Sequence, residues 1–133
     1  MNIVIDTNVV ISGTFFGGAP RRVLEAVVEK TVSAFATSEI VDEYSEIVDE
    51  MIRRKQGHLS PAVLAPFIQN LRMIESVSDI QVSRDPDDDK FIECAVDAKA
   101  LFVVSGDKDL LVLERYEDVE IIRAAEFCRR YLP

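Results

Sequence analysis

Acidic side chains stand at several places in this chain where a carboxylate is costly unless a cation or a hydrogen-bond donor meets it. Asp6 and Asp107 each come shortly after an apolar run, and Glu43 lies beside the apolar stripe of an expected helix. A dense group of aspartates follows at residues 85–89. Asp6 by itself could simply cap a turn, but the other acids favour a shared site that holds a cation.

The aspartates at residues 85–89 are the most crowded of these groups. Four carboxylates within five residues repel one another, so they are expected to bind protons or remain loose unless positive charge is near. Capping a helix needs only one or two of them. Asp89 has the best-defined direction because the helix that follows fixes it, so we rank it above Asp88 and Asp87 as the site residue.

The residue types decide which cation such a site would hold. The chain has two widely separated cysteines and one histidine, which cannot assemble a Cys/His zinc site. Mg²⁺ prefers oxygen ligands and keeps several waters, so a cluster of carboxylates favours Mg²⁺ or Mn²⁺ over Zn²⁺. A bound ion of this kind lowers the pKa of water and stabilises a leaving oxygen. The acids therefore predict a centre for the hydrolysis of phosphodiester bonds.

Short apolar runs predict the strands that would position these acids. They lie at residues 2–5, 32–36, 101–104 and 119–122. Residues 77–82 form either a weak strand or a connector. Residues 7–18 contain three glycines and are expected to leave the first strand as a loop, with at most a first helical turn.

Apolar residues at helical spacing predict helices between the strands. The expected helices cover residues 20–30, 38–55, 61–74, 89–96, 110–116 and 125–131. Thr37 or Ser38 can cap the second of them, a break at residues 57–60 follows it, and Pro66 should kink the third. Glu43 falls in the first half of the second helix, at the edge of its buried stripe.

Strands that alternate with helices imply right-handed crossovers and a mostly parallel sheet covered on both faces. We therefore predict an α/β fold with three layers, α/β/α, in a single domain over residues 1–133. In such sheets the active site lies beyond the carboxyl ends of the strands. Asp6 and Asp107 follow two of these ends, and the helix with Glu43 follows a third.

Composition bounds the class of protein and its partners. With 48% apolar residues the chain can bury a core, and it has no apolar run of eighteen or more residues, so we expect a cytoplasmic protein without a membrane span. Fifteen Lys plus Arg against 24 Asp plus Glu give a net charge of −9, which argues against non-specific nucleic-acid binding. Bound divalent ions would nevertheless present positive charge to phosphate.

Four segments, in this order, resemble the PIN-domain family. They read IDTNVV at residues 5–10, SEIVDEY at 38–44, DKFIECA at 89–95 and VSGDKDL at 104–110. The resemblance covers essentially the whole chain, and four acids in order are more specific than any single motif. More narrowly, the chain is similar to PIN-domain toxins of type II toxin–antitoxin modules, the VapC-like ribonucleases.

The resemblance implies a role for each matching residue. The metal-binding and catalytic carboxylates would be Asp6, Glu43, Asp89 and Asp107, and the supporting residues would be Asn8, Ser105 and Asp109. It also implies a PIN-like fold, RNA as the substrate, an antitoxin protein as a partner, and a homodimer.

Two other readings remain open at this stage. A phosphatase of the haloacid-dehalogenase type also places an aspartate after its first strand, but it needs a second carboxylate where this chain has Asn8, which cannot act as a general acid. A non-catalytic interaction module could use the same acids to hold a structural ion or a basic partner. RNA cleavage that requires a divalent ion would separate the nuclease from both.

Overall fold

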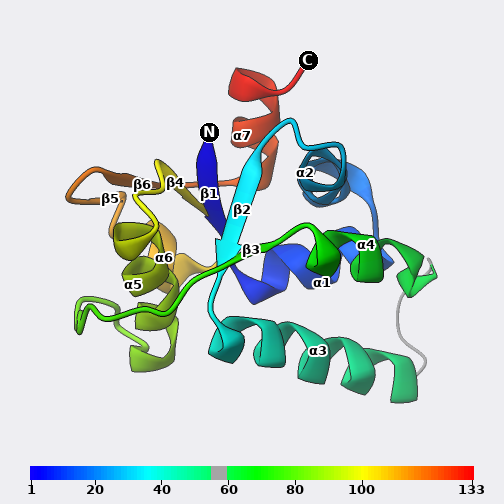
Figure 1. Ribbon diagram of the computed structural model, residues 1–133, viewed down its shortest axis with the longest axis horizontal. Helices are drawn as coiled ribbons and strands as arrows, with labels where there is room; N and C mark the ends of the chain where they lie inside the picture. The colour runs from blue at the N-terminus through cyan, green and yellow to red at the C-terminus, as the bar shows by residue number, and fades with distance from the viewer. Residues whose placement is uncertain (55–59) are drawn as a thin grey trace.

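A mostly parallel sheet runs through the middle of the computed structural model, which describes residues 1–54 and 60–133 (Figure 1). In the described ranges its strand order is β3-β2-β1-β4-β6-β5, and every neighbouring pair is parallel except the antiparallel pair β5 and β6. The strands are β1 (Asn2–Ile5), β2 (Ser33–Ala36), β3 (Arg72–Met73), β4 (Phe102–Val104), β5 (Arg115–Tyr116) and β6 (Val119–Ile122). The predicted strands at 2–5, 32–36, 101–104 and 119–122 are confirmed within a residue.

Helices cover both faces of this sheet. They are α1 (Thr7–Phe15), α2 (Gly18–Val28), α3 (Ser38–Arg53), α4 (Leu64–Gln69), α5 (Asp89–Asp97), α6 (Lys108–Leu111) and α7 (Ala124–Tyr131), with single 3₁₀ turns at Pro61–Val63 and Pro86–Asp88. In Figure 1, α5 lies at the lower left, below β4, β5 and β6, while α1, α2 and α4 lie to the right of β2. The predicted three-layer α/β/α class is confirmed.

The central strands are continuous apolar runs because both of their faces are covered. In β1, Ile3, Val4 and Ile5 are almost fully buried, and they pair in register with the residues of β4. The same core takes in apolar side chains of α2 and α5 such as Leu24 and Ile92. This packing holds the central strands in place. It therefore also sets the positions of the residues that directly follow their carboxyl ends.

The prediction of a loop at residues 7–18 was wrong, because most of this segment is the helix α1. The helix is buried on nearly all sides, so its sequence lacks the one-sided apolar spacing that marks a surface helix. Gly13 was read as a loop residue, yet it lies where α1 meets α2. A Cβ there would come within 2.9 Å of the backbone of Pro20, so only glycine allows this close approach.

Two predicted helices are shorter than expected. The helix at 61–74 ends at Gln69, where the side chain and backbone of Asn70 both donate to the carbonyl of Pro66, and β3 follows. The helix at 110–116 is the short α6, because Glu114 and Glu117 take positive φ and turn the chain into the β5–β6 hairpin.

Two further predictions concern the segment before α5 and the segment after α3. Residues 77–82 form a connector, one of the two options left open. The expected end of the helix at residue 55 and the break beginning at residue 57 lie outside the described residues. None of the helices in the described ranges is both long and apolar enough to cross a bilayer.

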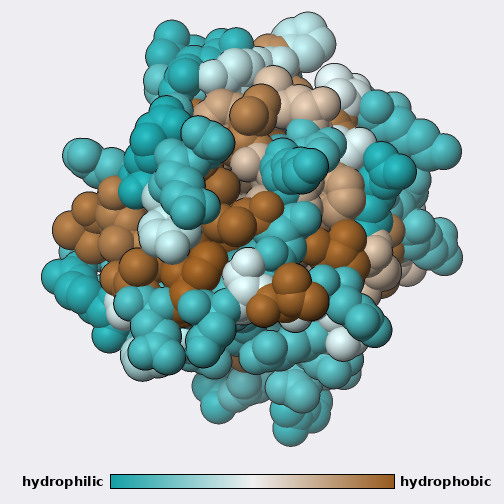
Figure 2. All heavy atoms as spheres, turned by 60° about the vertical axis from the view of Figure 1, so that its left-hand side comes forward, coloured by the Kyte–Doolittle hydropathy of each residue, from teal (hydrophilic) through white to brown (hydrophobic). Residues whose placement is uncertain are grey.

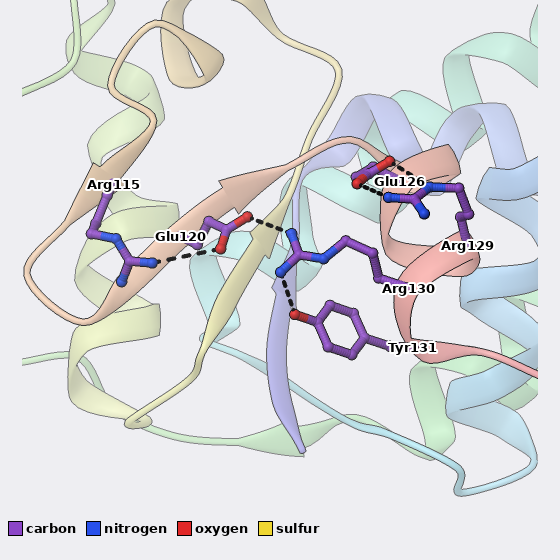
Figure 3. Close-up of polar contacts among 6 residues, drawn as sticks. All are labelled: Arg115, Glu120, Glu126, Arg129, Arg130 and Tyr131. Atoms are coloured by element: carbon purple, nitrogen blue, oxygen red, sulfur yellow. Dashed lines mark hydrogen bonds and ion pairs between the residues drawn. The ribbon is translucent and has the colours of Figure 1, made fainter.

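The C-terminal helix α7 is held against the sheet by rings and by ion pairs, and Figure 3 shows the ion pairs. Phe102 of β4 packs against Phe127 and Tyr131, with ring centroids 5.7 and 4.9 Å apart. Glu120 of β6 accepts from Arg130 at 3.0 Å and pairs with Arg115 at 3.6 Å. Exposed ion pairs contribute little stability, so the buried rings carry most of the attachment.

The surface is mainly hydrophilic, in keeping with the high content of charged residues. Figure 2 shows one face on which hydrophilic side chains surround a band of apolar ones. Elsewhere in the chain, single exposed apolar residues such as Val77 and Val112 are ordinary for a folded protein.

Candidate functional site

The carboxyl ends of three neighbouring parallel strands meet at one edge of the sheet. The backbone N–H of Asp6, directly after β1, donates to the carbonyl of Val104 at the end of β4 at 3.0 Å. In turn, the N–H of Ser105 donates to the carbonyl of Ile122 at the end of β6 at 2.9 Å. Side chains that follow these strands are therefore neighbours in space, although they are about a hundred residues apart along the chain.

Asp6 has its carboxylate held from two sides. Its Oδ1 accepts from the backbone N–H of Val9 at 3.0 Å, which caps the start of α1. Its Oδ2 accepts from the hydroxyl of Ser105. The residue is only 3% exposed, so these two donors offset part of the cost of burying the charge.

Ser105 links Asp6 to Asp107. Its fully buried hydroxyl donates to Asp6 and accepts from the backbone N–H of Asp107 at 2.9 Å. Asp107 caps α6, and its Oδ1 accepts from the N–H of Asp109 at 2.8 Å. One serine thus sets the relative position of the two strand-end acids.

Glu43 reaches the same edge from α3. Thr37 caps this helix, and the buried Tyr44 donates its hydroxyl to the carbonyl of Ile5, which ties α3 to the end of β1. The carboxylate of Glu43 accepts from the hydroxyl of Thr7 at Oε2 and from Nζ of Lys90 at Oε1, the latter at 2.7 Å. Glu43 is thereby held beside Asp6 by a hydroxyl and an ammonium group.

The structure brings Asp88, rather than Asp89, to the other three acids. The Oδ1 of Asp89 accepts from the backbone N–H groups of Val82 and Ser83 at 3.2 and 2.8 Å, so this side chain braces the preceding loop. Successive residues of a helical turn point about 100° apart, so only one of the two can face the strand ends. The ranking of Asp89 first rested on the direction of a helix whose rotation about its axis the sequence does not reveal.

The four converging acids surround a hollow of about 190 Å³, which we call the acidic hollow. Its lining consists of Asp6, Thr7, Asn8, Glu43, Ile47, Asp88 and Asp107. Asn8 lines this hollow, and its side-chain amide has no hydrogen-bond partner among the described residues. The predicted site residues Asp6, Asn8, Glu43 and Asp107 therefore share one cavity wall, and Ser105 lies directly behind it.

Burial and mutual repulsion raise the pKa values of two of these acids. Burial, opposed by the hydrogen bonds from Ser105 and Val9, raises the pKa of Asp6 to about 6. Burial and the charges of Asp107 and Asp85 raise the pKa of Asp88 to about 7. Carboxylic acids with such values bind protons near neutral pH unless a cation replaces the protons.

The residues of the acidic hollow fit a divalent cation. All of the polar side-chain groups in its lining carry oxygen, as Mg²⁺ and Mn²⁺ prefer. The Oδ2 atom of Asp88 is buried and has no hydrogen-bond donor among the described residues, a costly state that a cation would relieve.

A second acidic group adjoins the hollow. Carboxylate oxygens of Asp85, Asp88 and Asp109 all lie within 4.8 Å of one another. Arg84 offsets part of this charge, because its Nε lies 3.0 Å from Oδ1 of Asp109. Asp109, predicted to be a supporting residue, therefore lies near Asp88 and donates its backbone N–H to Asp107.

Sequence reasoning missed Thr7 and Lys90. Thr7 was assigned to a loop, so nothing indicated that its hydroxyl would face Glu43 from the first turn of α1. Lys90 offered a clue, because a lysine that directly follows the aspartates at residues 85–89 is expected to pair with one of them.

A family model described as a PIN domain matches residues 2–109, which include every site residue named above. The uncharacterized protein MJ1680 of Methanocaldococcus jannaschii is 31% identical over 117 residues, which are 85% of this chain and 75% of that protein. No solved structure gave a match.

Proposed function

Because the chain belongs to the PIN-domain family, whose members are generally nucleases, we propose that it is a metal-dependent endoribonuclease that hydrolyses RNA phosphodiester bonds. The observation that carries this proposal is the convergence of Asp6, Glu43, Asp88 and Asp107 on one hollow at the carboxyl edge of the sheet. Bringing these negative charges together costs free energy, because they repel one another and lose contact with water. The binding of a divalent cation would offset this cost.

Mg²⁺ or Mn²⁺ would be held by the carboxylates of Asp6, Glu43, Asp88 and Asp107. When bound, such an ion lowers the pKa of water and stabilises the negative charge that develops on the leaving oxygen. It also supplies the positive charge toward phosphate that a chain of net charge −9 otherwise lacks. In this proposal Asp88 takes the role that the sequence prediction gave to Asp89, because Asp88 lines the acidic hollow.

The surrounding residues position these acids. Ser105 and the N–H of Val9 fix the direction of the Asp6 carboxylate, while Thr7 and Lys90 fix that of Glu43. The free amide of Asn8 can donate to a phosphate oxygen or accept from a water at the mouth of the hollow. Such fixed donors and acceptors favour catalysis because they need not reorganise during the reaction.

The phosphatase alternative is disfavoured by the surroundings of Asp6. The residue two positions later is Asn8, which cannot serve as the general acid. A phosphatase would hydrolyse small phosphate monoesters, and a non-catalytic module would cleave nothing.

The biological setting is proposed on family likeness alone. We propose that the chain acts as a toxin, with an antitoxin protein as its partner, and that it forms a homodimer in the cytoplasm. Expression should then arrest growth, and co-expression of the neighbouring small gene should relieve the arrest. Light scattering during gel filtration would measure the number of copies in the assembly.

The nuclease proposal is tested with the purified chain and labelled single-stranded RNA. We expect cleavage in Mg²⁺ or Mn²⁺, none in EDTA, and none by Asp6→Asn in either ion. Asp118→Asn is the matched control, because it removes the same charge from an exposed site in the β5–β6 turn. Cleavage by Asp6→Asn at the wild-type rate would overturn the assignment.

A further inference from the structure

A second hollow, of about 370 Å³, lies next to the acidic hollow, and we call it the side hollow. Asn8 lines both of them, so they adjoin at this residue. Ser105, which donates to Asp6, also lines the side hollow from the loop after β4. Its size is within the usual range for sites that bind small molecules, about 300 to 1,000 Å³.

The side hollow is built where segments from both ends of the chain meet. One wall comes from the first turns of α1 and α2, with Val9 and Pro20, and the other from Arg123 and the start of α7. Arg123 lies beyond residues 2–109, the part that the family model matches. This hollow therefore owes part of its lining to a segment outside the matched family core.

The lining combines three kinds of group that suit a nucleotide. Val9, Pro20 and Ala124 provide apolar surface against which a base can pack. The amide of Asn8 can donate and accept at a base edge. The space beside Gly106 is open, because a Cβ at this position would have no neighbour within 4 Å on the protein.

Arg123 supplies the positive charge. It is exposed, it follows the end of β6 directly, and it has no acidic partner among the described residues. By contrast, Arg84, Arg115 and Arg130 each pair with a carboxylate. A guanidinium left unpaired in a chain of net charge −9 can bind a phosphate without first giving up an ion pair.

We propose that the side hollow binds the nucleotide next to the scissile phosphate, with its base against Val9, Pro20 and Ala124 and its phosphate on Arg123. This inference rests on the proposed nuclease function and names the part of the chain that holds the substrate beside the cut. It makes the side hollow, together with Asn8, the determinant of which base is accepted there.

The first test replaces Arg123 with glutamine. Loss of one charged contact to phosphate should raise KM for single-stranded RNA about tenfold while kcat changes little. The slope of log binding constant against log salt concentration should also fall by about the amount that one phosphate contact contributes. A purely structural role of Arg123 would not change this slope. Arg53→Gln is the matched control, because Arg53 is exposed in the last turn of α3.

The second test changes the charge at the mouth of the side hollow without touching the core. Ala125 is exposed and lines the hollow in the first turn of α7. A glutamate is favourable in the first turn of a helix, so Ala125→Glu should keep the fold while repelling phosphate. We expect Ala125→Glu to raise KM, and we expect high salt to make this rise smaller. Ala125→Gln should change KM less, because glutamine has the shape of glutamate without its charge.

The outcomes separate the two proposals. If the wild-type chain cleaves no RNA in Mg²⁺ or Mn²⁺, the proposed function fails and this inference fails with it. If the wild type cleaves RNA but Arg123→Gln and Ala125→Glu retain its KM and its salt dependence, the nuclease stands and the nucleotide site is refuted. If circular dichroism shows that Arg123→Gln is unfolded, the comparison of Ala125→Glu with Ala125→Gln decides.

Discussion

Nζ of Lys90 lies 2.7 Å from Oε1 of Glu43, and the lysine side chain is only 9% exposed. The same ammonium group is 3.2 Å from Oδ1 of Asp87. Burial lowers the pKa of Lys90, but hydrogen bonds to Glu43 and Asp87 outweigh it and raise the pKa above its ordinary value. Lys90 is therefore a fixed positive charge that balances Glu43 at the edge of the acidic hollow.

Lys90→Met should destabilise the metal-free chain, because Glu43 would keep its charge without its partner. We expect a loss of about 2 kcal/mol, the usual size for a hydrogen bond to a charged group. Mg²⁺ should then raise the melting temperature more in Lys90→Met than in the wild type, since the ion replaces part of the missing charge. Thermal unfolding in EDTA and in Mg²⁺ measures both effects.

Lys90→Arg serves as the control, because it keeps the charge and should keep most of the stability. If the melting temperature of Lys90→Met equals that of the wild type in EDTA, the ion pair has no role in holding Glu43.

Asp88→Asn and Asp89→Asn should behave differently, although the two residues are adjacent. Asp88 lines the acidic hollow, so Asp88→Asn should lose cleavage in Mg²⁺ while its metal-free stability stays the same or rises as repulsion falls. At position 89 the amide oxygen of asparagine can still accept from Val82 and Ser83, so the variant should keep its fold and most of its activity.

Cleavage rates and melting temperatures of the two variants, measured side by side, check this expectation. The opposite result, an inactive Asp89→Asn beside an active Asp88→Asn, would restore the ranking made from the sequence.

The fold class could be predicted because the strands are continuous apolar runs that alternate with helices. The helix α1 could not, because it is buried on nearly all sides and its Gly13 serves close packing against α2 rather than a turn. In the site, the meeting of Asp6 and Asp107 at one edge of the sheet could be predicted because both follow strands. The choice between Asp88 and Asp89 depends on how the chain turns before α5, which only tertiary packing determines.

Asp97 fixes the connector between β3 and α5. Its carboxylate accepts from the hydroxyls of Ser76 and Ser78 and from the backbone N–H groups of Val77 and Ser78. Although burial acts in the opposite direction, these hydrogen bonds lower the pKa of Asp97 to about 2. Its stabilising effect is therefore present above its ordinary pKa of 3.8 and is lost as the pH falls toward 2.

We expect Asp97→Ala to lower the free energy of unfolding by about 1 kcal/mol at neutral pH, because the connector loses its main anchor. The difference from the wild type should disappear near pH 2, and urea titrations at both pH values would measure it. Asp118→Ala, in the exposed turn between β5 and β6, is the control and should have little effect. A deficit in Asp97→Ala that persists unchanged at pH 2 would contradict this account.

The metal-free chain should be more stable at pH 5 than at pH 8. The pKa values of Asp6 and Asp88 in the folded chain are about 6 and about 7, above their ordinary value of 3.8. The folded chain therefore holds more protons than the unfolded chain between these values. The resulting stabilisation is complete below pH 3.8 and is lost as the pH rises through 6 and 7. Melting temperatures in EDTA should fall over that range.

Mg²⁺ should reverse this trend, because it binds only after the protons leave and then supplies the missing positive charge. The rise in melting temperature on adding Mg²⁺ should therefore be small at pH 5 and large at pH 8. Asp88→Asn should flatten both curves, whereas Asp118→Asn should follow the wild type. If Mg²⁺ stabilises Asp88→Asn as strongly as the wild type at pH 8, the ion does not bind at the acidic hollow, and the proposed metal centre is refuted.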